Sequence, residues 1–217
     1  MRLKQTGIFE GRVQVRYSYG RFGWTRNGGK TWHGGIDLVA LDDKTVRMPY
    51  YKGKKITGKV TRARIVYNHN DKTWEWGWYV CVQLDANQTP DTVNFLYFCH
   101  CSCLLVSVGQ KVSSGDALAI MGQTGNAANG YDHTHLEARA TATGTGVDPT
   151  EYAGCANTVG IYGTNEEDKP AEDTAANTGK LQVITVGPVS QGDADAILAV
   201  CKERGLTDAG LYKSDWA

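Results

Sequence analysis

The sequence predicts a mainly β protein with a small α/β segment at its C-terminal end. Glycine is abundant, with 26 residues, and proline is scarce, with 5. Val, Thr, Tyr and Trp are frequent, and residues 8–150 show no clear amphipathic helical periodicity. Both observations favour short strands and turns over helices. Residues 180–217 combine a strand pattern with apolar residues at helical spacing, which predicts a β-α unit.

Apolar residues alternate most clearly over residues 74–84. One face of this segment would carry Trp74, Trp76, Trp78, Val80, Val82 and Leu84. A period of two predicts a strand with one buried face. Because the tryptophans continue into an aliphatic stripe, we expect them to belong to the core; the alternative is a stacking platform for a ligand. We expect further strands over residues 94–103, 118–121 and 136–140.

Composition narrows the classes of function. The chain has 217 residues, of which 41% are hydrophobic, and 23 basic residues balance 23 acidic ones. Because the net charge is zero, overall electrostatic attraction does not favour binding to nucleic acid. No stretch is long and apolar enough to span a membrane, and the first residues lack the apolar core of a signal peptide. The pattern carries no indication of an oligomeric state.

The chain divides by composition into three parts. Residues 1–154 carry the strand patterns and form the expected main domain. Residues 155–179 contain an acidic run, a proline and few large apolar residues, so we expect a linker. Residues 180–217 would form a β-α appendage, which is small for an independent core.

Two short motifs hold three of the 5 histidines. His33 and Asp37 are separated by Gly34-Gly35-Ile36, and His133 and His135 are separated by one threonine. Imidazole and carboxylate groups are good zinc ligands, and a catalytic zinc needs three protein ligands and one open position. The two motifs are therefore candidates for a shared metal site.

The later motif is expected on a strand, where residues two apart point the same way. His133 and His135 would then share a polar face with Glu137 and Arg139. Both rings could bind one ion, or one could bind the metal while the other handles protons or oxyanion charge.

The earlier motif is expected at a bend. Gly34-Gly35 argues against a helix, because each glycine costs about 1 kcal/mol relative to alanine, but a glycine bend can bring His33 and Asp37 onto one ion. His100, near the end of the strand expected over 94–103, is either a buried core histidine or a proton donor or acceptor for the site. His69 lies in a turn-rich segment and is expected to be a solvated loop residue.

These motifs resemble the lysostaphin-type (LytM-like) zinc peptidases of bacterial cell walls. The family pattern is His-x-x-x-Asp, an aromatic-x-His, a Gly-rich stretch and His-x-His. The matching segments are WHGGID at 32–37, FCH at 98–100, VSVGQKVSSGDALAIMGQTGN at 106–126 and HTHLEAR at 133–139. The resemblance covers about residues 11–150.

The resemblance implies a mainly antiparallel β fold with an open groove, and a zinc endopeptidase that cleaves peptidoglycan, in its stem peptide or cross-bridge. It implies that His33, Asp37 and His135 hold Zn²⁺ and that His100 and His133 are catalytic. Without a visible signal peptide, a phage or prophage lysin is the expected setting, acting on the bacterial cell wall. Phe98, Cys101 and Thr134 depart from the usual family residues, but none removes a ligand, so they bear on substrate preference.

Other interpretations compete with this one. Residues 180–217 are weakly similar to SPOR-like repeats, which bind peptidoglycan; the other interpretation is a packing appendage. The chain could also be a degenerate peptidase that binds the wall or activates a partner without catalysis. The stretch 106–122 resembles biotinyl or lipoyl domains, but it lacks their modified lysine.

A Cys-His amidase using Cys99 or Cys103 would need an activated thiolate, typically at a helix N-terminus.

Overall fold

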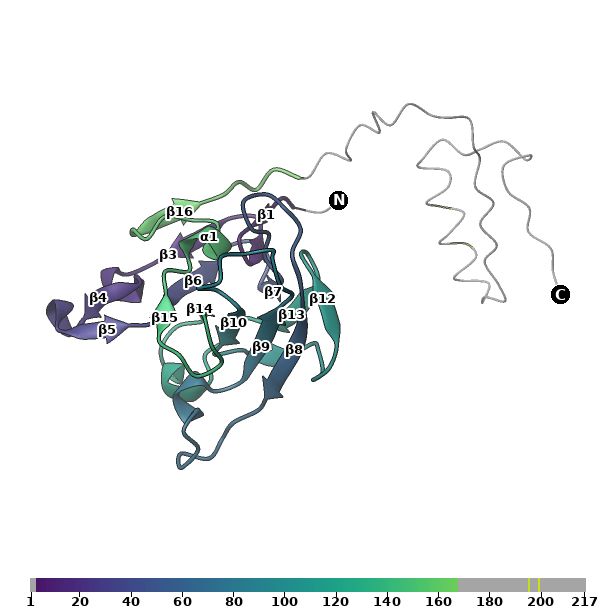
Figure 1. Cartoon of the computed structure of the whole chain (residues 1–217). Helices are drawn as coiled ribbons and strands as arrows, with labels where there is room; N and C mark the ends of the chain where they lie inside the picture. The colour runs from purple at the N-terminus through teal and green to yellow at the C-terminus, as the bar shows by residue number, and fades with distance from the viewer. Residues whose placement is uncertain (1–2, 168–194, 196–198, 200–217) are drawn as a thin grey trace, which may run out of the picture. The chain divides into compact units, whose positions relative to one another are not determined.

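The computed structural model describes residues 3–167, together with residues 195 and 199 (Figure 1). The chain splits into two compact units, Met1–Pro170 and Ala171–Ala217, and the described residues fall almost entirely in the first. The expected appendage over 180–217 and its SPOR-like similarity lie outside the described residues, apart from those two positions. Within the described residues, none of the helices has the length and apolar character needed to cross a membrane.

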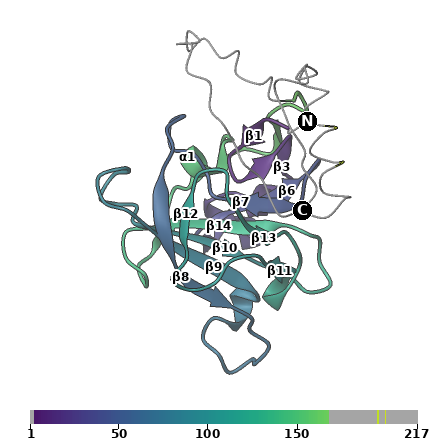
Figure 2. The same cartoon turned by 90° about the vertical axis from the view of Figure 1, so that its right-hand side faces the viewer.

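Antiparallel strands dominate the described part of the chain, as Figures 1 and 2 show. The main sheet has the order β12 (Lys111–Ser113), β8 (Thr57–Arg64), β9 (Tyr79–Leu84), β10 (Phe95–Cys99), β14 (Thr134–Arg139), β6 (Ile36–Ala40), β3 (Val13–Val15) and β16 (Gly160–Tyr162), with β15 (Gly146–Val147) paired to β14. Smaller sheets join β11 (Cys103–Leu104), β13 (Ala117–Ile120) and β7 (Thr45–Arg47); β1 (Gln5–Thr6) and β2 (Phe9–Glu10); and β4 (Gly23–Arg26) and β5 (Thr31–His33). The predicted mainly antiparallel β fold is confirmed.

Helices are few and short in the described residues. The α-helix α1 spans Thr150–Ala153, and four 3-10 helices span Ser18–Gly20, Asn27–Gly29, Trp74–Trp76 and Gly125–Ala127. They connect strands, so the sheets carry the core.

The central strands are buried on both faces. Val80 and Val82 of β9 belong to the main hydrophobic core, while Tyr79 and Cys81 join a second cluster on the other face. The expectation of one strand over 74–84 with one buried face is therefore wrong. The strand begins at Tyr79, and the chain before it turns at Gly77, which has a φ of +62°. Gly77 also packs closely on Gly125: a Cβ atom on Gly77 would lie 2.4 Å from the backbone nitrogen of Gly125.

The strand expected over 94–103 ends early. It stops at Cys99, and His100 adopts a left-handed φ of +64°. Cys99 therefore lies in the second cluster and Cys101 in the main core, whereas an unbroken strand would place both on one face. Cys103 is exposed.

The segment after residue 154 is not all linker. Gly160–Tyr162 forms β16 and pairs with β3 in the main sheet. An acidic, turn-rich composition conceals this three-residue strand, because edge strands this short carry almost no periodic signal. Most of the remaining linker and the boundary at residue 180 lie outside the described residues, so this part of the domain division stays a prediction.

Candidate metal and catalytic centre

Sheet register places the first two candidate ligands opposite each other. His135 of β14 pairs directly with Asp37 of β6, and paired residues of neighbouring strands point to the same face. The His135 Nδ1 atom lies 3.0 Å from Asp37 Oδ1. Both side chains are buried, and Asp37 is only 2% exposed.

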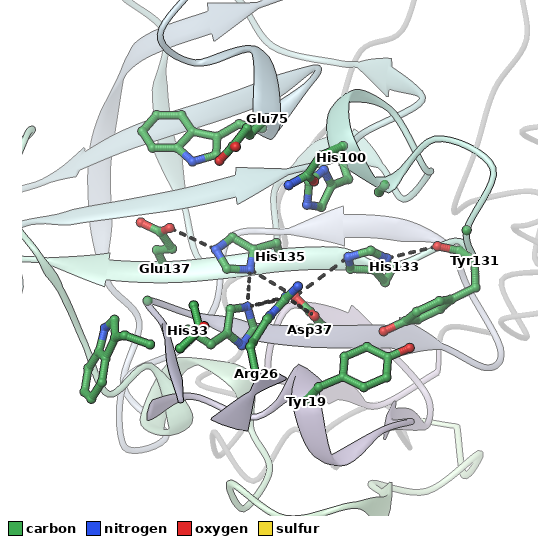
Figure 3. A pocket seen from close by; sticks show the side chains of 17 residues that line it. Tyr19, Arg26, His33, Asp37, Glu75, His100, Tyr131, His133, His135 and Glu137 are labelled. Atoms are coloured by element: carbon green, nitrogen blue, oxygen red, sulfur yellow. Dashed lines mark hydrogen bonds and ion pairs between the residues drawn. The ribbon is translucent and has the colours of Figure 1, made fainter. Parts of the chain in front are cut away.

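His33 reaches the same point through the Gly34-Gly35 bend that follows β5. Its Nε2 atom lies 2.9 Å from His135 Nδ1 and 3.3 Å from Asp37 Oδ1 (Figure 3). Gly35 makes this approach possible, because a Cβ there would lie 2.4 Å from the Leu136 carbonyl oxygen and 2.8 Å from the His135 ring. The structure thus brings His33, Asp37 and His135 together.

The hydrogen bonds around the two rings favour one tautomer of each neutral imidazole. His33 Nδ1 lies 2.8 Å from the Arg21 carbonyl oxygen, and His135 Nε2 lies 2.9 Å from Glu137 Oε1. Each of these nitrogens donates its N–H outward, so in the neutral rings His33 Nε2 and His135 Nδ1 would present lone pairs toward Asp37. Three acceptor atoms then face one another, an arrangement that a cation between them would satisfy.

The spacing of these three atoms is close to that of a tetrahedral zinc site. Zinc–nitrogen bonds of about 2.0–2.1 Å in a tetrahedral site separate neighbouring ligand atoms by about 3.3 Å. The three observed separations are 2.9, 3.0 and 3.3 Å. Glu137 supplies the carboxylate that commonly orients a zinc-bound histidine.

Charge is concentrated among these buried groups. Burial alone would raise the pKa of Asp37, but hydrogen bonds and attraction from His135 and His33 hold it well below its usual value. Burial alone would lower the pKa of His135, yet Asp37 and Glu137 raise it to about 9. In the metal-free protein at neutral pH His135 therefore carries a second proton, on Nδ1 beside Asp37, and a metal bound at Nδ1 must displace it.

His133 and His100 lie beside this cluster. His133 Nδ1 donates to the Tyr131 carbonyl oxygen at 2.9 Å, and His100 Nδ1 donates to that of Thr124 at 2.9 Å. The two ring centroids are 4.8 Å apart. Burial is the main cause that lowers both pKa values, that of His100 to about 3, so both rings are neutral near pH 7. The Nε2 atom of His133 lies 3.7 Å from Asp37 Oδ1.

The left-handed backbone at His100 has a structural consequence. Phe98 pairs with Leu136 on the core face, and Cys99 pairs with His135. A strand continued through residue 100 would turn that side chain toward the core with Phe98. The positive φ instead directs the imidazole to the His135 side of the sheet, which explains why strained backbone occurs here.

Arg26 is a site residue that the sequence analysis missed. Its guanidinium Nη2 donates to Asp37 Oδ2 at 2.7 Å and to His33 Nε2 at 2.8 Å. The pairing of β4 with β5 carries Arg26 to the site, and arginine is no metal ligand, so motif spacing gives no signal for it. Metal binding at His33 Nε2 requires this hydrogen bond to break.

A cavity of about 540 Å³ opens over these groups, and we call it the catalytic pocket. It is lined by all five predicted site residues, with Arg26, Glu137, Tyr19, Tyr131 and Glu75 among the others (Figure 3). His69 does not line it. The arrangement provides one candidate metal position with two neutral imidazoles beside it, in a pocket large enough for an extended peptide.

The sequence comparison decides the family. Residues 32–149, which include every predicted site residue, match peptidase family M23. The chain belongs to peptidase family M23. The predicted resemblance to the lysostaphin-type peptidases is thereby confirmed.

Solved structures give further similarities to this M23 chain. The catalytic domain of lysostaphin from Staphylococcus simulans is 22% identical, with 63% of this chain and 89% of that one covered and a TM-score of 0.44. The catalytic domain of a variant of the prophage-encoded M23 protein EnpA from Enterococcus faecalis is 21% identical, with 65% and 92% covered and a TM-score of 0.47. A complex of SpoIIIAH and SpoIIQ is 18% identical, with 68% and 98% covered and a TM-score of 0.47. No curated protein matches the chain.

The cysteine alternative finds little support in this M23 domain. Cys99 is fully buried, and this burial raises its thiol pKa well above the usual value. The exposed Cys103 does not line the catalytic pocket. Neither cysteine lies at a helix N-terminus, so neither has the environment that activates a thiolate.

Proposed function

We propose that this chain is a zinc-dependent endopeptidase that hydrolyses peptide bonds of bacterial peptidoglycan, in the stem peptide or cross-bridge. The observation that carries the proposal is the convergence of three acceptor atoms, at His33, Asp37 and His135, in a pocket with two neutral imidazoles. Membership of a peptidase family and the cell-wall peptidase motifs supply the reaction and the substrate class.

His33 Nε2, Asp37 Oδ1 and His135 Nδ1 would hold the zinc. When bound, zinc acts as a Lewis acid that polarises the scissile carbonyl and lowers the pKa of water at its open position to about 7. Glu137 keeps the His135 Nε2 proton on the outer side of the ring, so Nδ1 stays available as a ligand.

His133 and His100 would move protons and stabilise charge. Their Nδ1–H groups donate to backbone carbonyls, so their Nε2 atoms would be the ones to exchange protons with a peptide held in the catalytic pocket. A neutral imidazole can accept the proton of the attacking water, and the imidazolium so formed can donate it to the leaving amine. A protonated ring also stabilises the oxyanion that develops at the cleaved carbonyl.

Metal-dependent digestion of purified cell walls tests the proposal. Mass spectrometry of the muropeptides released from several wall types, with and without a chelator, would identify the cleaved bond. We expect chelation to abolish release and zinc to restore it. Undiminished release after thorough metal removal would contradict the proposal.

A non-catalytic role in wall binding or activation of a partner is the second candidate, and Arg26 favours it. Its guanidinium already satisfies His33 Nε2 and the outer oxygen of Asp37, as a permanently metal-free site would require. Protein that takes up no zinc at millimolar concentration would support this role and reject the first.

The leading proposal includes where the enzyme acts and what the C-terminal residues do. We place this enzyme on the bacterial cell wall, released from a phage or prophage or exported by another route. Residues 180–217 would tether it to peptidoglycan and raise the local concentration of substrate. Removal of residues 171–217, the second compact unit, should then reduce wall binding but leave hydrolysis of a short peptide unchanged.

A further inference from the structure

A second cavity, of about 590 Å³, adjoins the catalytic pocket. Its lining includes the aromatic residues Tyr67, Trp74 and Trp78 and the amide residues Gln123, Asn126 and Asn129; we call it the aromatic pocket. Asn126 lines both cavities. A ligand in the aromatic pocket could therefore belong to the same molecule as a peptide in the catalytic pocket.

The aromatic rings of this pocket are accessible. Tyr67 is 71% exposed, and Trp74 and Trp78 are half-buried. The Trp74 ring stacks on His69 with centroids 4.0 Å apart, and Tyr67 meets Trp78 edge to face at 5.7 Å. These contacts hold the rings in place while leaving apolar faces open to a ligand.

The polar groups of the pocket are also available. In the described part of the chain, the side-chain amides of Gln123, Asn126 and Asn129 form no hydrogen bond with the protein, and all three residues are exposed. Each amide offers two N–H donors and a carbonyl acceptor. No Asp, Glu, Lys or Arg lines the pocket, so it favours a neutral ligand that both donates and accepts hydrogen bonds.

The wall between the two cavities is firmly built. The close approach of Gly77 and Gly125 joins the 3-10 helices Trp74–Trp76 and Gly125–Ala127. The Thr124 hydroxyl accepts a hydrogen bond from Trp78 N at 2.9 Å and donates to the Cys101 carbonyl at 2.9 Å. The pocket is therefore formed in advance, as ligand sites usually are.

We propose that the aromatic pocket binds a sugar ring of the glycan strand while the catalytic pocket holds the attached peptide. An N-acetylated sugar has a C–H face that packs on an aromatic ring, and its hydroxyl and acetamido groups match amide side chains. Such a ring is neutral and fits the cavity volume. This inference rests on the proposed function and deepens it, since it adds the glycan to the parts of peptidoglycan that the enzyme recognises.

Binding of peptide-free glycan provides the test. The probe is tetra-N-acetylchitotetraose, titrated into the zinc-loaded 217-residue chain and followed by NMR or tryptophan fluorescence. We expect saturable binding that Tyr67→Ala and Gln123→Ala each weaken by about three- to tenfold, the size of a lost aromatic contact or hydrogen bond. Ile65→Ala is the matched control, because Ile65 is 53% exposed and lies outside the lining.

Hydrolysis distinguishes a glycan site from a peptide site. We expect Tyr67→Ala to slow the digestion of whole walls but to cleave a short soluble peptide at the normal rate. Failure of the parent chain to bind the tetrasaccharide, or equal losses on walls and on the short peptide, would overturn the inference. Because binding is measured without turnover, a chain that binds the sugar but hydrolyses nothing would reject the proposed function and leave this inference standing.

Discussion

The catalytic and aromatic pockets lie on either side of the loop over residues 123–129, but their side chains differ in burial and in hydrogen bonding. The catalytic pocket gathers buried, titratable side chains whose outward N–H groups are tied to the protein. The aromatic pocket gathers exposed or half-buried rings, together with exposed amides that form no hydrogen bond with the protein within the described residues.

Metal binding and ligand recognition place different physical demands on the two pockets. Metal binding and proton transfer need fixed tautomers and fixed distances, which only buried hydrogen bonds supply. Recognition of a neutral ligand needs accessible faces and spare hydrogen-bonding groups. Substitutions in the catalytic pocket should therefore change metal binding, whereas those in the aromatic pocket should change only binding of the extended substrate.

Loss of a ligand should have the largest effect. Asp37→Asn keeps the shape of the side chain but removes its negative charge, so we expect zinc affinity to fall at least about 100-fold and wall hydrolysis to disappear. Asp91→Asn is the control, since Asp91 is exposed and lines neither pocket. Zinc titration against a competing chelator measures the effect, and unchanged affinity would remove Asp37 from the site.

A fall in pH should have the second-largest effect on zinc affinity. The pKa of His135 is about 9 in the metal-free protein, so below pH 9 the metal must displace a proton. Apparent zinc affinity should then fall about tenfold for each pH unit from 9 down to 7. Calorimetry in buffers of different ionisation enthalpy would detect the released proton. Release of no proton at pH 7.5 would contradict this account of His135.

Glu137→Gln should have an intermediate effect. The amide can no longer hold the His135 Nε2 proton by a charged hydrogen bond, and loss of such an orienting carboxylate typically costs about 10- to 100-fold in metal affinity. Glu151→Gln is the matched control, because Glu151 is exposed on α1. A change in stability without a change in zinc affinity would show that Glu137 acts through its ion pair with Arg139 instead.

Arg26→Gln should change zinc affinity least of these four perturbations, and it should raise the affinity where the others lower it. Because Arg26 competes for His33 Nε2 and neutralises Asp37, its removal should tighten zinc binding by about tenfold. Arg21→Gln serves as control, since the Arg21 guanidinium donates to the Ser18 carbonyl. Weaker zinc binding in Arg26→Gln would mean that this arginine supports the loaded site.

Much of the centre could be predicted from sequence because its chemistry is local. The spacing of His33 with Asp37 and of His133 with His135 depends on one bend and one strand, whose geometry follows from glycine content and a period of two. The strand face also anticipated Glu137 beside His135. The resemblance to the family predicted that His100 is a site residue, whereas its apolar neighbours alone would have predicted a core residue.

What the sequence could not provide comes from turns and tertiary pairing. The positive φ of His100 reverses the side that alternation would predict. Arg26 reaches the metal position only through a hairpin, and Trp74–Trp76 leave the strand because Gly77 turns the chain. The strand at 160–162 exists through its pairing with β3. None of these features has a signature of its own.

Crystallography of zinc-loaded protein, with anomalous scattering measured at the zinc edge, would locate the metal directly. We expect one zinc bound by His33 Nε2, Asp37 Oδ1 and His135 Nδ1, with Arg26 withdrawn from His33 and a fourth position open toward His100 and His133. Zinc found elsewhere, or an unchanged Arg26 bridge with no anomalous peak among these three side chains, would contradict it.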